Sequence, residues 1–148
     1  MLDVGRLAVL QWPLEIFAFL FLLVGVLYPY TQWGTLPDRV PSHFDFRGRP
    51  DHWSGRGVFL WFALLEVFRY GIFSLQGGTL DHITGARPFY HVVDLILLWT
   101  KTVVTGLFAY LNWTIVRVAR GQAGKANLFV LLGISALLVL PLVLLPKR

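Results

Sequence analysis

Residues 36–57 read LPDRVPSHFDFRGRPDHWSGRG, and they separate two long apolar runs of the chain. The prolines restrict the backbone to extended or turn geometry, and Gly48 offers a position where a positive φ angle costs little. A connection between two membrane helices needs only a few residues, so a longer, stiffened and highly charged one indicates a folded element. We therefore predict a structured, mostly non-helical loop over 31–57 that caps a helical bundle.

Apolar residues gather into four blocks around this loop, at 14–30, 58–75, 92–119 and 128–145. Each block is about long enough to cross a hydrocarbon core of ~30 Å as a helix. The chain is 56% hydrophobic and 14% charged, whereas soluble domains carry about 25% charged residues. The sequence predicts an all-α fold, a four-transmembrane-helix bundle that forms one integral membrane domain over 1–148. We expect helices at about 7–30, 58–75, 91–119 and 128–145, and a polar loop over 76–90, where Gly77-Gly78 and Arg87-Pro88 are turn signals.

The composition excludes several classes of function. The chain contains no cysteine, which excludes disulfides, thiolate catalysis and cysteine-ligated metals. Its net charge of +5 comes from basic residues dispersed over loops and ends, so no nucleic-acid partner is expected. No small-residue cleavage site follows the first apolar block, so we expect a retained helix rather than a signal peptide. These features predict a multi-pass protein of a cell membrane whose principal partner is the lipid bilayer.

The orientation in the membrane depends on the arginines of the loop, which are Arg39, Arg47, Arg49 and Arg56. With four spans, the 31–57 loop and the 121–126 turn share one side, which carries seven Lys and Arg residues against four on the other. This excess would place the loop in the cytoplasm. The loop arginines alternate with aspartates, however, and could be held by them in ion pairs. Discounting the four arginines leaves three basic residues against four, so the orientation stays open.

Four side chains of the loop could bind a divalent metal: His43, Asp45, Asp51 and His52. Imidazole and carboxylate groups are common ligands of such ions, and a turn at Gly48 would bring the two pairs together. No established ligand spacing is matched, and the loop arginines could neutralise the aspartates instead. A lid that covers the bundle without chemistry is the plain alternative. No other cofactor is indicated, and the histidines lie at or outside the expected helix ends, which argues against haem.

A second set of polar residues lies inside the apolar blocks: Glu66, Arg69, Asp94, Lys101 and Asn112. Charges at membrane depth are costly and usually face a bundle interior, a partner or water. Glu66 and Arg69 are spaced to pair along one helix face, and Asp94, Lys101 and Asn112 share a face of the third helix. Glu15, near an end of the first helix, is expected to reach the headgroups. The set predicts either a neutral structural core or the polar lining of a path for a substrate or ion.

The order and spacing of the loop residues resemble a family signature. The signature, roughly LP-x-x-[IV]-P-x-H-[FW]-x-x-x-G-x-P-[DE], follows the first transmembrane helix in DUF1648 proteins, many of which belong to the SdpI-like group. The matching positions are Leu36, Pro37, Pro41, His43, Gly48, Pro50 and Asp51, with Trp53 shortly after them. Asp45 stands where members often have Asn, and Arg56 stands where Lys is usual. The second half of the chain shows no such resemblance.

This resemblance implies a small multispan membrane protein of prokaryotes. The best-known member type protects a cell against a secreted killing factor and sequesters a transcriptional repressor at the membrane. We therefore expect a binding, immunity or sensing role, with a protein or peptide partner and with an oligomer or larger complex as its setting. Three alternatives stay open: a transporter or channel-like subunit, an accessory subunit of a membrane complex, and a metal-assisted membrane enzyme. No catalytic residues are established for the signature, and enzymatic activity is not expected.

Overall fold

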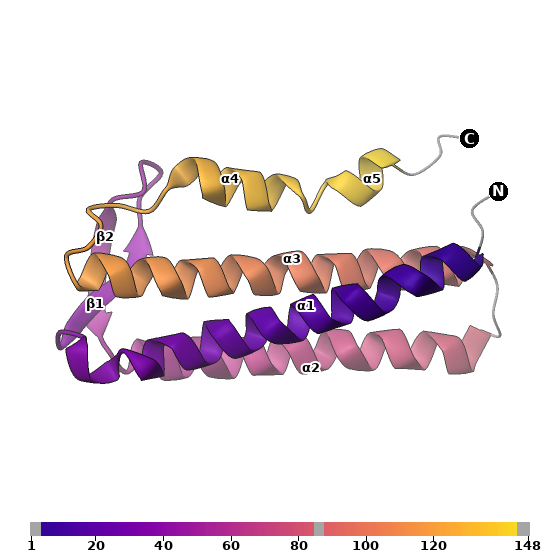
Figure 1. Ribbon diagram of the computed structural model, residues 1–148, viewed down its shortest axis with the longest axis horizontal. Helices are drawn as coiled ribbons and strands as arrows, with labels where there is room; N and C mark the ends of the chain where they lie inside the picture. Colours follow the sequence, from indigo (N-terminus) through magenta and orange to yellow (C-terminus); the bar gives the residue numbers. More distant parts are fainter. Residues whose placement is uncertain (1–3, 85–87, 145–148) are drawn as a thin grey trace.

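The computed structural model describes residues 4–84 and 88–144, and it is mostly helical with one small two-stranded sheet (Figure 1). Three long helices, α1, α2 and α3, run side by side, and a short helical segment, α4 and α5, lies along α3. In chain order the elements are α1 (Val4–Thr31), the 3-10 turn η1 (Trp33–Thr35), β1 (Arg39–Phe44), β2 (Pro50–Gly55), α2 (Val58–Thr84), α3 (Pro88–Ala119), α4 (Leu128–Ala136) and α5 (Leu140–Leu144).

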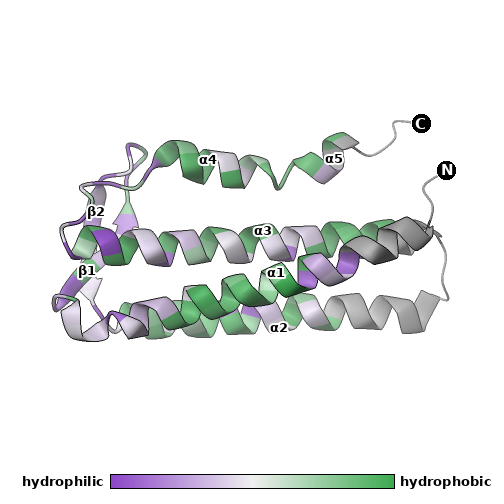
Figure 2. Ribbon diagram, in the orientation of Figure 1, coloured by the Kyte–Doolittle hydropathy of each residue, from purple (hydrophilic) through white to green (hydrophobic). Residues whose placement is uncertain are grey.

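Helix α3 is the centre of the arrangement, because it contacts α1, α2, β1 and α4. Within the described residues, three helices are long and apolar enough to cross a membrane, at Gln11–Thr31, Val58–Leu75 and Val92–Ala119. Figure 2 shows that apolar residues dominate these helices, while strongly polar residues gather towards the end that carries the sheet. The chain is therefore a multi-pass membrane protein by the length and composition of its helices.

The fourth helix expected over 128–145 is not continuous. Its described part forms α4 and α5, separated at residues 137–139. Pro141 explains the break, because proline has no N–H to donate to the carbonyl of Leu137 and its ring would clash with that carbonyl in a regular helix. The indole Nε1 of Trp99 donates to the Leu137 carbonyl at 2.8 Å. Helix α3 thus supplies a donor at the point where the fourth segment breaks.

The loop expected over 76–90 is also different, because α2 continues to Thr84 and α3 already begins at Pro88. A glycine inside a helix costs only about 1 kcal/mol relative to alanine, so Gly77 and Gly78 weaken the helix without ending it. Pro88 occupies the first turn of α3, where a missing N–H removes no helical hydrogen bond. Arg87-Pro88 therefore marks the start of α3, whereas Gly77-Gly78 does not mark the start of a loop.

The loop between α1 and α2 contains a β-hairpin, so the fold is not purely helical. Strands β1 and β2 pair antiparallel, with Arg39 opposite Gly55, Val40 opposite Ser54 and His43 opposite His52. The register shifts on either side of His43. Proline is tolerated in this sheet because each strand of a two-stranded sheet is an edge strand. The expectation of a structured, mostly non-helical loop agrees with this geometry.

The hairpin lies across the end of the helices, roughly perpendicular to them (Figure 1). Val40 and Pro41 of β1 are fully buried, and Val40 packs in a small core with Phe59 of α2 and Val116 of α3. At the tip, Gly48 has a φ angle of 75° and its carbonyl accepts a hydrogen bond from the Ala126 N–H at 2.7 Å. The hairpin is thereby fixed at both ends, by apolar packing at its base and by a backbone hydrogen bond at its tip.

We predict that Gly48→Ala loosens the hairpin. A Cβ at this position would lie 2.4 Å from the Ala126 carbonyl oxygen, on a backbone with a φ angle of 75°. Such strain typically costs about 1–3 kcal/mol, which thermal unfolding in detergent micelles measures. Gly34→Ala is the matched control, since nothing lies within 4 Å of a Cβ there. Equal unfolding temperatures for both variants would contradict the tethering of the tip.

Candidate functional site

The signature residues of the hairpin form a compact set of polar contacts. His43 Nδ1 and Asp51 Oδ1 lie 2.6 Å apart across the two strands, and both side chains are exposed. The hydroxyl of Ser54 donates to that of Ser42 at 2.9 Å. Two of the four residues considered as metal ligands therefore come together, namely His43 and Asp51.

Asp45, considered above as a metal ligand, instead binds backbone N–H groups of the hairpin tip. Its Oδ1 accepts the backbone N–H groups of Arg47 and Arg49, each at 2.8 Å. The hydrogen bond from the Arg49 N–H is the main cause that holds the pKa of Asp45 below its ordinary value of 3.8, and the Arg47 N–H adds to it. The carboxylate of Asp45 thus closes the tip of the hairpin rather than facing a metal.

The metal site does not assemble around these four residues. Among residues 4–84 and 88–144, no group of three or more His, Asp or Glu side chains is arranged to hold a metal ion. His52 lies opposite His43 in the ladder and is exposed to solvent. The contact of His43 with Asp51 is explained by cross-strand pairing alone.

Below the hairpin, Glu66 and Asn112 form a polar contact inside the three-helix core. Both side chains are buried, and Asn112 Nδ2 donates to Glu66 Oε1 at 3.1 Å and to the Gly25 carbonyl at 2.9 Å. These bonds join α1, α2 and α3 at one level. Gly25 leaves the space that they need, because a Cβ there would lie 2.7 Å from Glu66 Oε2.

The sequence predicts that Arg69 pairs with Glu66, but the structure gives Arg69 other partners. Its Nη2 donates to Thr105 Oγ1 at 2.7 Å, and its guanidinium lies 5.7 Å from the ring centroid of Phe108. Thr105 and Asn112 are about two turns apart on α3, so the two charged side chains of α2 diverge towards different partners. Within the described residues, Glu66 Oε2 and the Nε and Nη1 atoms of Arg69 are buried without a hydrogen-bond partner.

The sequence places Lys101 on one helix face with Asp94, but in the structure Lys101 pairs with Glu15. Its Nζ contacts both carboxylate oxygens of Glu15, at 2.6 and 2.5 Å, and the Ser74 hydroxyl at 3.2 Å. Tyr70 donates its hydroxyl to Glu15 at 2.8 Å. Glu15 is therefore paired with Lys101 of α3 and Tyr70 of α2 while 41% of its side chain stays exposed, so its reach towards the headgroups stays a prediction. Asp94 is itself buried on α3.

Sequence reasoning missed Glu15 and Tyr70 as members of this polar core. The available signal was that Glu15 and Lys101 both lie inside apolar blocks and carry opposite charges. Charges at membrane depth usually find each other, even when they lie on different helices. Asp94 was preferred because it is close to Lys101 in sequence, whereas the structure selects a partner across the helix interface.

The hairpin and the helix core meet at a pocket of about 320 Å³. One wall is the apolar surface of Phe62 from α2, Phe108, Leu111 and Ile115 from α3, and Leu131 from α4. The opposite wall is β1 and the start of the tip, from Ser42 to Asp45. Asn112 lines the pocket as well and holds Glu66 behind it. Such a space suits an apolar group that carries a hydrogen-bonding or charged head.

We predict that Glu66 and Asn112 are energetically coupled. Replacing either residue by Leu leaves the other buried polar group without its partner, so each single variant is destabilised. Since the double variant removes both groups, it should be less destabilised than the sum of the single variants, by about 0.5–2 kcal/mol. A double-mutant cycle of unfolding free energies in mixed micelles measures this coupling. Strict additivity of the two changes would show that the contact contributes nothing.

Comparison with known proteins gives one match. The family described as "Domain of unknown function (DUF1648)" matches residues 20–66, which cover the second half of α1, the hairpin and the start of α2. No curated protein and no solved structure matches the chain. The match includes every signature position of the hairpin and ends at Glu66. Residues 20–66 are therefore a DUF1648 segment, which covers about a third of the chain.

Proposed function

We propose that this protein is a membrane binding protein with a sensing or immunity role of the SdpI-like type. In this proposal, residues 1–148 act as one membrane domain, and the interrupted segment of α4 and α5 is its fourth membrane-embedded part. The hairpin caps the bundle, and the pocket beneath it is the binding site. The protein belongs in the cell membrane of a prokaryote.

The pocket between the hairpin and α3 is the observation that carries this proposal. Ordinary membrane helices are joined by short turns, whereas here a rigid hairpin is packed at its base and tethered at its tip. That construction keeps His43 and Asp45 over an apolar space at the end of the helices. A hairpin that only connected two spans would need neither the tether nor the pocket.

The chemistry of the walls defines the class of ligand. The aromatic and aliphatic wall favours an alkyl chain or an apolar side chain, while Asp45 and Asn112 offer acceptors for a donor group. An amphipathic peptide or amine would satisfy both walls. A protein or peptide segment with these properties is compatible with the binding or sensing role implied by the family resemblance.

We predict that filling the pocket abolishes ligand binding. Leu131→Trp on α4 would occupy the space, and Leu132→Trp is the control, because Leu132 is exposed on the same helix and lies outside the pocket. Alkyl amines and short amphipathic peptides are screened by thermal unfolding in nanodiscs. A ligand at about 100 times its Kd adds about 2.7 kcal/mol, or roughly 5–10 °C.

The stabilisation should appear in the wild type and in Leu132→Trp, and be absent from Leu131→Trp. If the whole panel leaves the wild type unchanged, or if it stabilises Leu131→Trp equally, the pocket is not a binding site for this class of ligand.

A transport role is the second candidate, favoured by the buried polar atoms of Glu66 and Arg69 that have no partner in the described residues. Water or a passing ion could satisfy these atoms. On this reading, Glu66→Gln lowers proton or cation flux in proteoliposomes at least tenfold, whereas Leu64→Ala on the exposed face of α2 leaves it unchanged. A wild type that shows no flux above protein-free liposomes removes this candidate.

A further inference from the structure

The end of the molecule that carries the hairpin is strongly basic. Seven basic side chains belong to the hairpin, the end of α3 and the connection to α4: Arg39, Arg47, Arg49, Arg56, Arg117, Arg120 and Lys125. Three acidic side chains belong to the same end, Asp38, Asp45 and Asp51. Seven positive against three negative charges leave a net charge of +4. The charge matters for a partner only if the arginines are not already neutralised within the hairpin.

The structure shows that the aspartates are mostly engaged elsewhere. Asp45 accepts two backbone N–H groups at the tip, and Asp51 contacts His43. Of these three aspartates, only Asp38 lies within ion-pair distance of an arginine among the described residues, at 3.8 Å from Arg56.

The remaining three arginines of the loop, Arg39, Arg47 and Arg49, are exposed and make no ion pair within the part of the chain that the structure describes. Among the described residues, three of the four loop arginines are therefore not neutralised by a direct ion pair.

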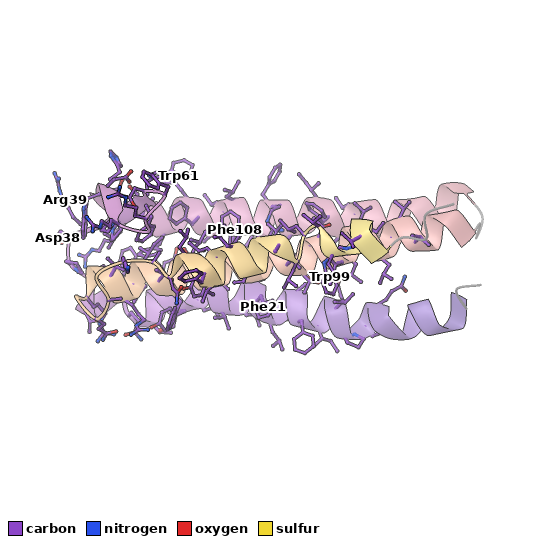
Figure 3. All side chains as sticks on the ribbon, turned by 90° about the horizontal axis from the view of Figure 1, so that it is seen from above. Phe21, Asp38, Arg39, Trp61, Trp99 and Phe108 are labelled. Atoms are coloured by element: carbon purple, nitrogen blue, oxygen red, sulfur yellow. The ribbon has the colours of Figure 1, made fainter. Side chains whose placement is uncertain are left out.

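The position of the hairpin would bring these arginines to the surface of a membrane. The hairpin lies across the ends of the helices (Figure 1). In a bilayer that these helices cross, its long axis would run in the plane of the membrane. Asp38, Arg39 and Trp61 all lie at this end of the molecule in the view from above (Figure 3). Phe46 and Trp61 are 78% and 73% exposed, and aromatic side chains of this kind mark the headgroup layer.

We propose that the hairpin end rests on the cytoplasmic leaflet and contacts its anionic phospholipid headgroups through Arg39, Arg47 and Arg49. Guanidinium groups bind phosphate oxygens through several parallel hydrogen bonds, and the exposed aromatic rings enter the boundary between headgroups and acyl chains. This surface fixes the orientation that the count of basic residues alone left open. It also places the pocket beneath the hairpin on the cytoplasmic side.

Cysteine labelling tests the orientation, because the chain has no cysteine of its own. His52→Cys puts one thiol on the hairpin, and Thr84→Cys puts one at the end of α2, remote from the hairpin. In intact bacterial cells, a membrane-impermeant maleimide should label Thr84→Cys at least tenfold more than His52→Cys. Permeabilised cells should label both. Labelling of His52→Cys in intact cells, alone or together with Thr84→Cys, would overturn the proposal.

The headgroup contact has a separate readout in nanodiscs. An environment-sensitive dye on His52→Cys should shift to shorter wavelength when 30% phosphatidylglycerol replaces phosphatidylcholine, and about 0.5 M NaCl should remove most of the shift by screening. Changing Arg39, Arg47 and Arg49 together to Gln should reduce the shift at least threefold, with an unchanged unfolding temperature. Changing Asp38 to Asn is the control that should preserve it. A shift that is independent of lipid charge or of the three arginines would overturn the headgroup contact, whatever the orientation.

Discussion

The hydrogen bond between the Ala126 N–H and the Gly48 carbonyl is the constraint on which the end of the molecule depends. It joins the tip of the hairpin to the connection between α3 and α4, two parts of the chain that are far apart in sequence. Val40 and Pro41 hold the base of the hairpin by burial, so the strands cannot pivot away from the helices. The same hairpin supplies one wall of the pocket, from Ser42 to Asp45.

The helix core obeys a second constraint, which is that a polar group in a bilayer must find its partner within the protein. Helix α3 supplies most of these partners, since Asn112 holds Glu66, Thr105 holds Arg69, and Lys101 holds Glu15. The first two contacts join α3 to α2 at two different heights, and the third joins α3 to α1. Together they limit how far the helices can slide past one another. Gly25 permits a close approach of α1 to Glu66 of α2 and Ala109 of α3, and its carbonyl takes part in the same network.

Much of this arrangement could be predicted from the sequence, because it depends on local composition. Apolar runs marked the three helices able to span a membrane, and the spacing of Pro41, Gly48 and Pro50 marked a rigid loop. The partner of Lys101 and the direction of Arg69 depend on how helices rotate against each other, which no local pattern encodes. Pro141 is a signal for a helix break, but the uninterrupted apolar run of 128–145 favoured the prediction of one continuous helix. Asp45 shows the same limit, since either Asn or Asp at this position can accept the backbone N–H groups of the tip.

The attachment of the hairpin to the bundle can be tested directly by one spectroscopic measurement. Arg47 at the tip and Lys125 after α3 line the same surface depression, and both are exposed. Spin labels on cysteines at these two positions, in the otherwise cysteine-free chain, should show strong dipolar broadening in nanodiscs, with Arg39 and Lys125 as the more distant control pair. Spectra for the first pair without broadening, equal to the sum of the two singly labelled proteins, would show that the hairpin moves freely and would contradict the account.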